Sequence, residues 1–186
     1  MKNIELISNE NISIRLMQNT EKDMEFLLQW LSNPQVVKYA YAEGAPWNMD
    51  KIVEEFAEKT EEGGSSTPCF IVYNHKEIGY LQYYPIKEDS YAFNSPETFK
   101  MLEGGYGLDT FIGEPELWNK GIGSQAINLI KDYLKDKLQI KVLCVDPETD
   151  NARAVHFWQK VGFETIDIIK NYDDENKNSF LMMNKL

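Results

Sequence analysis

The stretch from Gly105 to Gln125 constrains the fold of this chain more than any other segment. Its sequence, GYGLDTFIGEPELWNKGIGSQ, begins with an apolar run around one carboxylate, Asp109, which is typical of a strand. The turn Lys120-Gly121-Ile122-Gly123 then opens an amphipathic segment. Apolar residues recur in this segment at a helical period, at Ile122, Ala126, Leu129, Ile130, Tyr133, Leu134 and Leu138. The stretch therefore predicts a strand, a glycine turn and a helix in direct succession.

The glycine turn has two interpretations. Two glycines at a helix start let a ligand approach the backbone closely, and the first-turn N–H groups lack intrahelical partners at the positive end of the helix dipole. Such a site commonly binds phosphate; a tight turn without a ligand is the alternative. The chain contains no G-x-x-x-x-G-K-[ST], which excludes a P-loop. It also contains no G-x-G-x-x-G, because position 126 is alanine, which excludes a dinucleotide-binding fingerprint.

The length and charge of the chain limit the partners to be expected. The chain has 186 residues, of which 42% are hydrophobic and 26% charged, so we expect one soluble domain over residues 1–186. A net charge of −11 disfavours binding to nucleic acid or anionic membranes and favours cationic ligands. The alternative is that the acidic surface only maintains solubility.

The two cysteines and two histidines give little basis for a metal site. Cys69 and Cys144 lie in apolar, strand-like runs and are expected to be buried thiols of a reducing compartment. With only His75 and His156 besides, we predict no metal cluster. The N-terminus is too polar for a signal peptide and no apolar run is long enough to span a membrane, so we expect a cytoplasmic protein.

Before residue 105, the patterns predict a strand at 11–16, two helices and a hairpin. Thr20 is the expected N-cap of the first helix, with Asp23 as its capping-box partner, and Asn48 caps the second. The segment 36–47 between them has no clean period and is either a substrate flap or a packed connector. Strands at 67–73 and 77–84 form the hairpin, whose turn places His75 in solvent, and residues 85–100 read as a long loop.

After the helix at 121–138, a near-continuous apolar run at 141–147 predicts a buried strand parallel to the strand at 105–112. Asp146 lies at the carboxyl end of this run, where open α/β sheets bind ligands, although Asp146-Pro147 is equally a turn initiator. Asn151 is the expected N-cap of a helix at 152–161 that Gly162 ends. A pair of strands, at 163–170 and 179–184, completes the chain.

These elements and two motifs resemble the GCN5-related N-acetyltransferase (GNAT) family over nearly the whole chain. The segments GYGLDTFIGEP-x-x-W-x-KGIG and DP-x-x-x-N-x-RA-x-x-x-x-QK-x-GF are most similar to the aminoglycoside 6'-N-acetyltransferases within it. The resemblance implies an α/β (α+β) GNAT fold. This fold has a mixed, mostly antiparallel central sheet of about seven strands with one parallel splayed pair, flanked by about four helices.

The resemblance also implies acetyl-CoA as the acetyl donor, with no metal. Its pyrophosphate would bind the backbone of the glycine turn, and its pantetheine arm would run beside the end of the strand at 105–112. Asn151 would bond a cofactor amide. The implied cofactor-binding residues are Phe111, Ile112, Lys120, Gly121, Ile122, Gly123, Ser124, Gln125, Asn151, Ala154 and Trp158.

Two tryptophans depart from the general family pattern. Trp118 stands three residues before the first motif glycine, where the family commonly has Gln or Arg; the aminoglycoside-modifying members tolerate this change. Trp158 stands where many members have a tyrosine that protonates the departing CoA thiolate. Because an indole N–H is a poor acid, that tyrosine's role is not carried over to this chain.

The implied reaction is direct attack of a primary amine of a polycationic sugar on the acetyl thioester, a step that confers aminoglycoside resistance. Asp109 is the candidate to hold the ammonium group and accept its proton. Asp146, Glu103, Gln82, Tyr84 and Tyr106 are the candidate substrate-binding residues. The alternatives are a GNAT enzyme acting on protein N-termini or polyamines, and an acetyl-CoA-binding sensor without turnover. We expect a monomer or homodimer that binds neither nucleic acid nor membranes.

Overall fold

The computed structural model describes residues 4–40, 46–91, 93–170 and 177–186. Within these ranges it contains one eight-stranded sheet in the order β1-β2-β3-β4-β5-β6-β8-β7 and six α-helices. The strands are β1 (Glu5–Ser8), β2 (Ile12–Leu16), β3 (Thr67–Tyr73), β4 (Lys76–Pro85), β5 (Tyr106–Ile112), β6 (Val142–Val145), β7 (Glu164–Lys170) and β8 (Asn178–Lys185). The helices are α1 (Glu21–Leu31), α2 (Pro34–Ala40), α3 (Met49–Phe56), α4 (Pro96–Leu102), α5 (Ile122–Leu138) and α6 (Ala152–Lys160).

The strand pairing confirms the predicted mixed sheet. Neighbouring strands run antiparallel in β1–β2, β2–β3, β3–β4, β6–β8 and β8–β7. The strands β5 and β6 form the parallel pair, with the register Tyr106↔Leu143 and Gly107↔Cys144. The strand β5 continues to Ile112, five residues past Gly107. The α5 helix is the crossover between these two parallel strands, as the sequence predicts.

The chain divides into two compact units. The first comprises Met1–Tyr83 and Asp109–Tyr133, and the second comprises Tyr84–Leu108 and Leu134–Leu186. The strands β4 and β5 each run from one unit into the other. The prediction of a single domain over residues 1–186 stays a prediction beside this division.

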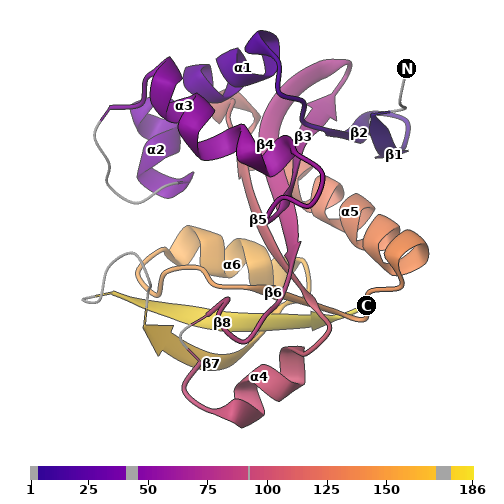
Figure 1. Ribbon diagram of the computed structural model, residues 1–186, viewed down its shortest axis with the longest axis vertical. Coiled ribbons are helices and arrows are strands. Elements are labelled where there is room, and N and C mark those ends of the chain that lie inside the picture. Colours follow the sequence, from indigo (N-terminus) through magenta and orange to yellow (C-terminus); the bar gives the residue numbers. More distant parts are fainter. Residues whose placement is uncertain (1–3, 41–45, 92, 171–176) are drawn as a thin grey trace. The chain divides into compact units, whose positions relative to one another are not determined.

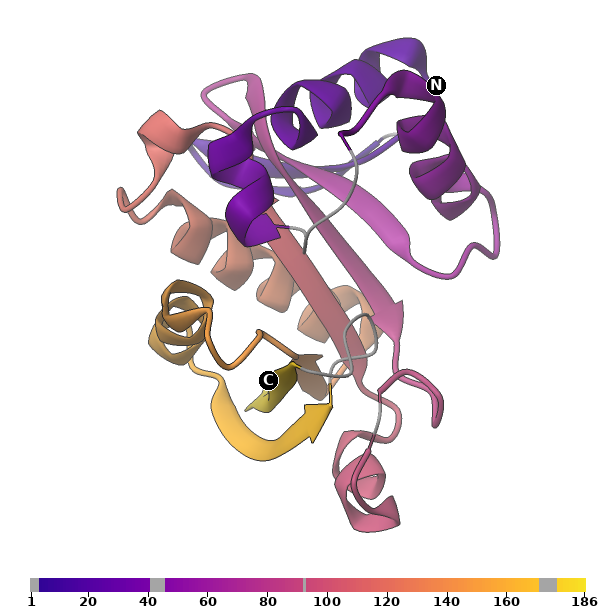
Figure 2. The ribbon, with the colours of Figure 1, turned by 90° about the vertical axis from the view of Figure 1, so that its left-hand side faces the viewer.

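In the first unit, helices cover both faces of the strands (Figures 1 and 2). The helices α1 and α3 bury a core against one face, where Tyr80 meets Phe56 edge-on at 5.4 Å and Trp30 meets Phe70 at 5.5 Å between ring centroids. On the other face the buried positions of α5 are apolar, namely Ile122, Ala126, Ile127, Leu129 and Ile130. Because one side of α5 is buried and apolar, the amphipathic period of this helix could be predicted from the sequence.

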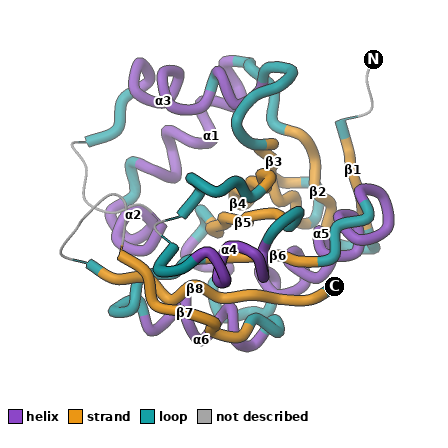
Figure 3. The backbone as a smooth tube through the Cα atoms, turned by 60° about the horizontal axis from the view of Figure 1, so that its bottom comes forward, coloured by secondary structure: helices purple, strands orange, loops and turns teal. Residues whose placement is uncertain are grey.

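In the second unit, β8 lies beside β7, with α4 and α6 on opposite sides of the pair (Figures 1 and 3). Leu102 of α4 belongs to a core with Cys144, Ile169 and Leu181. Trp158 of α6 packs edge-on against Phe163 at 5.1 Å between ring centroids. The predicted helix at 152–161 and the predicted final strand pair are thereby confirmed.

Three elements were not predicted. The strand β1 precedes the alternating pattern that begins at residue 11, and the helices α2 and α4 occupy segments predicted to be irregular. Each helix has only seven residues, too few for a clean period, and each starts at a proline, which fits the first turn of a helix. Residues 36–40 are thus helical, and residues 41–45 of the segment interpreted as either a flap or a connector lie outside the described ranges.

The predicted helix caps are confirmed, with one correction. Thr20, Asn48 and Asn151 each accept a hydrogen bond from the backbone N–H three residues ahead. Asp23, however, is not a capping-box partner of Thr20, because its carboxylate is bound by Arg15 and by the Gln18 backbone N–H. The stronger charged partner, Arg15, draws the Asp23 side chain away from the helix terminus.

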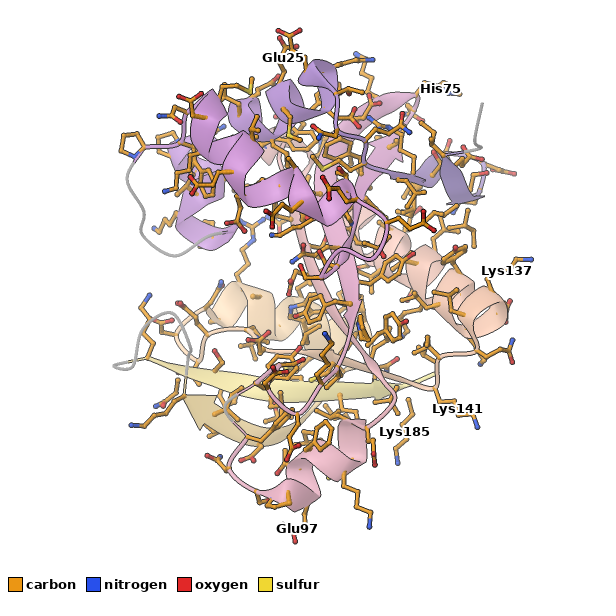
Figure 4. The ribbon with its side chains drawn as sticks, viewed as in Figure 1. Glu25, His75, Glu97, Lys137, Lys141 and Lys185 are labelled. Carbon is orange, nitrogen blue, oxygen red and sulfur yellow. The ribbon has the colours of Figure 1, made fainter. Side chains whose placement is uncertain are left out.

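The β3–β4 hairpin confirms the predicted position of His75. Asn74 and His75 have φ values of 47° and 64°, which is the conformation of a two-residue type I′ turn. Figure 4 shows His75 at the tip of this hairpin, pointing outward, and its side chain is exposed. His75 therefore lies in solvent, as expected.

Both cysteines are buried thiols outside any disulfide bond, as the sequence predicts. Burial raises the pKa of the Cys69 thiol, and the charge of Arg15 offsets only part of that increase. Cys69 therefore stays protonated at neutral pH and acts as a small apolar core residue.

Candidate active site

Asp109 lies half-buried on β5, in the first unit, beside Gln82 of β4. The Gln82 Nε2 group donates to Asp109 Oδ2 over 2.7 Å. Gln82 Oε1 accepts from the Tyr80 hydroxyl at 2.8 Å and from the Ser66 hydroxyl at 3.1 Å. The structure thus brings two of the predicted site residues, Asp109 and Gln82, into direct contact, and adds two hydroxyl residues that the sequence did not single out.

The strand pattern places Tyr80, Gln82 and Asp109 together. Side chains two residues apart on a strand point to the same face, so Tyr80 and Gln82 share one face of β4, and Asp109 and Phe111 share one face of β5. Tyr80 and Phe111 stack at 5.7 Å between ring centroids, with their planes 28° apart. The polar pair Gln82–Asp109 therefore adjoins an aromatic pair from the same two strands.

The end of β5 carries the predicted cofactor-binding residues Phe111 and Ile112, both half-buried. The Phe111 ring also meets Trp30 edge-on at 6.1 Å between centroids. The Trp118 indole N–H donates to the Ile112 carbonyl oxygen over 2.8 Å. Trp118 thus fixes the segment after β5 to its last residue, a structural role for the tryptophan that departs from the family pattern.

The glycine turn has the geometry expected at a helix start. Gly121 has φ +79°, a left-handed conformation that a residue with a Cβ atom rarely adopts. The first α5 bond closes from the Gln125 N–H to the Gly121 carbonyl. The N–H groups of Ile122, Gly123 and Ser124 precede this bond and have no intrahelical acceptor. Ile122 is buried, whereas Lys120 and Gln125 are exposed.

In the second unit, a tyrosine contact explains one of the motif glycines. The ring of Tyr84 lies over Gly107, where an added Cβ would come within 2.2 Å of the Tyr84 Cε2 atom. The Tyr84 and Tyr91 hydroxyls are 3.2 Å apart and share a hydrogen bond. Tyr106, the residue before Gly107, is half-buried on β5.

The two acidic candidates of the second unit differ in exposure. Asp146 is half-buried and directly follows β6, at the carboxyl end of that strand as predicted. Glu103 is exposed at the C-terminal end of α4. Asp146 is therefore the more constrained of the two acidic side chains.

Three candidates, Asn151, Ala154 and Trp158, lie at the start of α6 or within it. The Asn151 Oδ1 atom accepts from the Ala154 N–H at 3.1 Å, so its oxygen caps the helix. Ala154 is half-buried, and Trp158 is only 6% exposed and packs on Phe157 and Phe163. Trp158 is thus a largely covered side chain with two aromatic neighbours.

Within the described ranges, no group of three or more His, Cys, Asp or Glu side chains is arranged to hold a metal ion. Among the helices of those same ranges, none combines the length and the apolar character needed to cross a membrane.

The family described as "Acetyltransferase (GNAT) domain" matches residues 19–170, and the chain belongs to this family. Two relatives named "Aminoglycoside N(6')-acetyltransferase type 1", from Klebsiella pneumoniae and Serratia marcescens, are each 27% identical over 157 residues. The matches cover 84% of this chain and 76% of each relative.

Solved structures support the same fold. The structure of AAC(6')-Ib in complex with ribostamycin and coenzyme A has a TM-score of 0.79 at 22% identity and covers 95% of this chain and 94% of that one. An aminoglycoside N(6')-acetyltransferase from Legionella pneumophila has a TM-score of 0.70 at 21% identity, covering 96% and 94%. The mixed sheet of the described residues, in which β5 and β6 run parallel, therefore has the GNAT fold.

Proposed function

We propose that this protein transfers the acetyl group of acetyl-CoA to the 6'-amine of aminoglycosides and thereby confers resistance to them. The observation that carries the proposal is the Asp109 carboxylate. Asp109 lies on β5 in the segment GLDTFIGEP, and its carboxylate accepts a hydrogen bond from Gln82 of β4. Family membership supplies the reaction class, and the names of the two 27%-identical relatives supply the substrate.

The residues proposed to bind the acetyl donor fit acetyl-CoA, which supplies the thioester that the amine attacks. The N–H groups of Ile122, Gly123 and Ser124 are the proposed pyrophosphate donors, because a helix N-terminus with a glycine in the left-handed conformation favours an approaching anion. Lys120 adds a positive charge, and Gln125 adds a side-chain amide. The remaining proposed cofactor contacts are Phe111, Ile112, Asn151, Ala154 and Trp158.

Asn151 carries a donor group besides its capping oxygen. Its Oδ1 atom caps α6, while its Nδ2 group carries the hydrogens that a cofactor carbonyl would accept. Trp158 contributes covered apolar surface in this proposal and no proton. The thiolate of CoA leaves unaided or takes a proton from water.

Asp109 is the proposed group that receives the substrate ammonium and its proton. The Gln82 contact orients the carboxylate without neutralising its charge, because an amide is neutral. Tyr84, Tyr106, Glu103 and Asp146 are the proposed contacts to the sugar rings and to the other ammonium groups. A negative net charge of −11 also favours the encounter with a polycation.

Release of the CoA thiol with different amines tests this function. We expect turnover with kanamycin, and none with an aminoglycoside that carries a hydroxyl group in place of the 6'-amine. Mass spectrometry of the product should show one added acetyl group, and NMR should place it on the 6'-nitrogen. Turnover with spermidine or with a peptide N-terminus alone would instead support the other amine substrates, and thiol release with none of them would indicate a binding protein.

A further inference from the structure

The hydrogen-bond chain Tyr80–Gln82–Asp109 has a direction that the chemistry of its members fixes. An ionised carboxylate only accepts hydrogen bonds, so the amide nitrogen of Gln82 must face Asp109 Oδ2, 2.7 Å away. The amide oxygen of Gln82 must then face the other way. The hydroxyls of Tyr80 and Ser66, at 2.8 Å and 3.1 Å from that oxygen, are therefore both donors.

Tyr80 is more deeply buried than Gln82 or Asp109. It is 1% exposed, and its ring contacts Phe56 edge-on at 5.4 Å and Phe111 face-on at 5.7 Å between centroids. Its backbone carbonyl also accepts from the Thr110 hydroxyl at 2.9 Å. The Tyr80 hydroxyl is consequently a fixed donor, whereas Gln82 is half-buried and has rotatable side-chain bonds.

We propose that Tyr80 is a positioning residue: with Ser66, it locks the Gln82 amide so that its nitrogen always faces Asp109. This inference rests on the proposed role of Asp109 and goes beyond it, because it assigns the orientation of that carboxylate to a buried core tyrosine. Gln82 is the part that transmits the constraint. Loss of the Tyr80 hydroxyl lets the amide turn, and Asp109 then loses a fixed donor.

The strand supplies a matched control. Tyr83 is also on β4 and 5% exposed, but it alternates to the opposite face, and its hydroxyl bonds with Thr67 and Tyr133. Burial raises the pKa of the Tyr83 hydroxyl, so it stays neutral at working pH. Tyr80→Phe and Tyr83→Phe thus each remove one buried hydroxyl from the same strand and keep the ring.

Steady-state kinetics with kanamycin and acetyl-CoA test the positioning role. We expect Tyr80→Phe to lower kcat about 5- to 10-fold, the usual effect of one hydrogen bond, with the KM for acetyl-CoA unchanged. Tyr83→Phe should leave kcat within about 2-fold of the parent, since the Tyr83 hydroxyl bonds Thr67 and Tyr133 on the face of β4 opposite Gln82. Adding Ser66→Ala to Tyr80→Phe should lower kcat further. Equal kcat losses in Tyr80→Phe and Tyr83→Phe would overturn the proposal.

A double-mutant cycle isolates the route through Gln82. In a Gln82→Leu background, Tyr80→Phe should cause no further loss of kcat, because the amide it orients is gone. An undiminished effect in that background would show that the Tyr80 hydroxyl acts by another path, and it would reject the positioning role.

A measurement that needs no turnover separates this inference from the proposed function. The side-chain NH₂ signals of Gln82, assigned by their loss in Gln82→Leu, should move in ¹⁵N correlation spectra of Tyr80→Phe and of Asp109→Asn, and stay unchanged in Tyr83→Phe. If the parent protein acetylates no amine, the proposed function fails while this spectral result still decides the hydrogen-bond chain. Gln82 signals that do not respond to Tyr80→Phe would overturn it.

Discussion

Two carboxylates of the first unit, Asp23 and Asp109, are held by opposite kinds of partner. Asp23 is 4% exposed and receives two bonds from the Arg15 guanidinium, at 2.8 and 2.9 Å, and one from the Gln18 N–H at 2.8 Å. Asp109 is half-buried and receives the neutral Gln82 amide at 2.7 Å. Arg15 offsets the charge of the Asp23 carboxylate, whereas the Gln82 amide, being neutral, contributes only an orienting hydrogen bond to Asp109.

The strand β4 contributes to both arrangements, through Glu77 near its start and Gln82 near its end. Arg15 also bonds Glu77, at 3.0 Å, and lies over the Phe70 ring, 4.7 Å from its centroid. Burial on its own would lower the pKa of Arg15, but its bonds to Asp23 and Glu77 together raise it, so Arg15 stays charged. The two contacts therefore differ in charge: Asp23 forms an ion pair with Arg15, and Asp109 forms a hydrogen bond with a neutral amide.

Asp23→Asn should produce the largest effect, on stability. Breaking a buried ion pair costs about 3–5 kcal/mol when the other charge is left alone; because Arg15 keeps Glu77, we expect about 3 kcal/mol, the lower end of that range. Urea unfolding followed by circular dichroism should show a loss of this size, while kcat per folded molecule stays unchanged. A loss under about 1 kcal/mol would break the comparison, because Asp23 would then be no more structural than a surface charge.

Asp109→Asn should give the converse result. We expect kcat for kanamycin to fall about 10²-fold or more, the usual contribution of a positioned proton acceptor, with little change in the urea midpoint. Asp136→Asn, which alters an exposed carboxylate of α5, is the matched control and should be neutral in both assays. A near-normal kcat for Asp109→Asn would remove Asp109 from the proton-accepting role.

Salt should separate the two carboxylates with a smaller effect. Charges open to solvent are screened within about 8–10 Å at physiological ionic strength, and buried pairs much less. The KM for a polycationic substrate should therefore rise several-fold between low and high salt, while the stability difference between the parent and Asp23→Asn stays nearly constant. A salt-independent KM would count against electrostatic capture of the substrate.

Much of the local structure around these carboxylates could be predicted from the sequence, because it depends on patterns of neighbouring residues. The period of α5, the turn at Asn74-His75 and the caps at Thr20, Asn48 and Asn151 all depend on residues within a few positions of one another, and all are confirmed. The placement of Asp109 on a strand is likewise local. Short segments such as α2 and α4 were missed because seven residues contain too little periodicity.

The partners of the carboxylates could not be predicted, because they depend on strand register. Arg15 and Glu77 are 62 residues apart, and Gln82 and Asp109 are 27 apart. Nothing in the sequence states which side chains of β4 and β5 lie opposite each other. The same limit explains why the sequence favours a capping role for Asp23, and why it gives no sign that Tyr80, a core position, contacts Gln82.

Asp167 of β7 extends the comparison to the second unit with the smallest expected effect. Asp167 accepts from neutral donors, as Asp109 does from Gln82: the Asn94 amide at 3.0 Å, the Thr98 hydroxyl at 3.1 Å and its neighbour's backbone N–H at 2.8 Å. Partial burial alone would raise the pKa of Asp167, but these hydrogen bonds outweigh it and lower the pKa below its ordinary value of 3.8. The contribution of Asp167 to stability is therefore complete above that ordinary value and is lost as the pH falls through the folded-state pKa.

Asp167→Asn should accordingly be less stable than the parent at pH 5, with the difference shrinking below about pH 4. Urea midpoints measured at pH 5, 4 and 3 check this, with Asp132→Asn, an exposed carboxylate of α5, as the control. A difference that stays constant over this range would mean that neutral donors do not favour the ionised carboxylate here. The contrast drawn between charged and neutral partners of a carboxylate would then lose its support from the second unit.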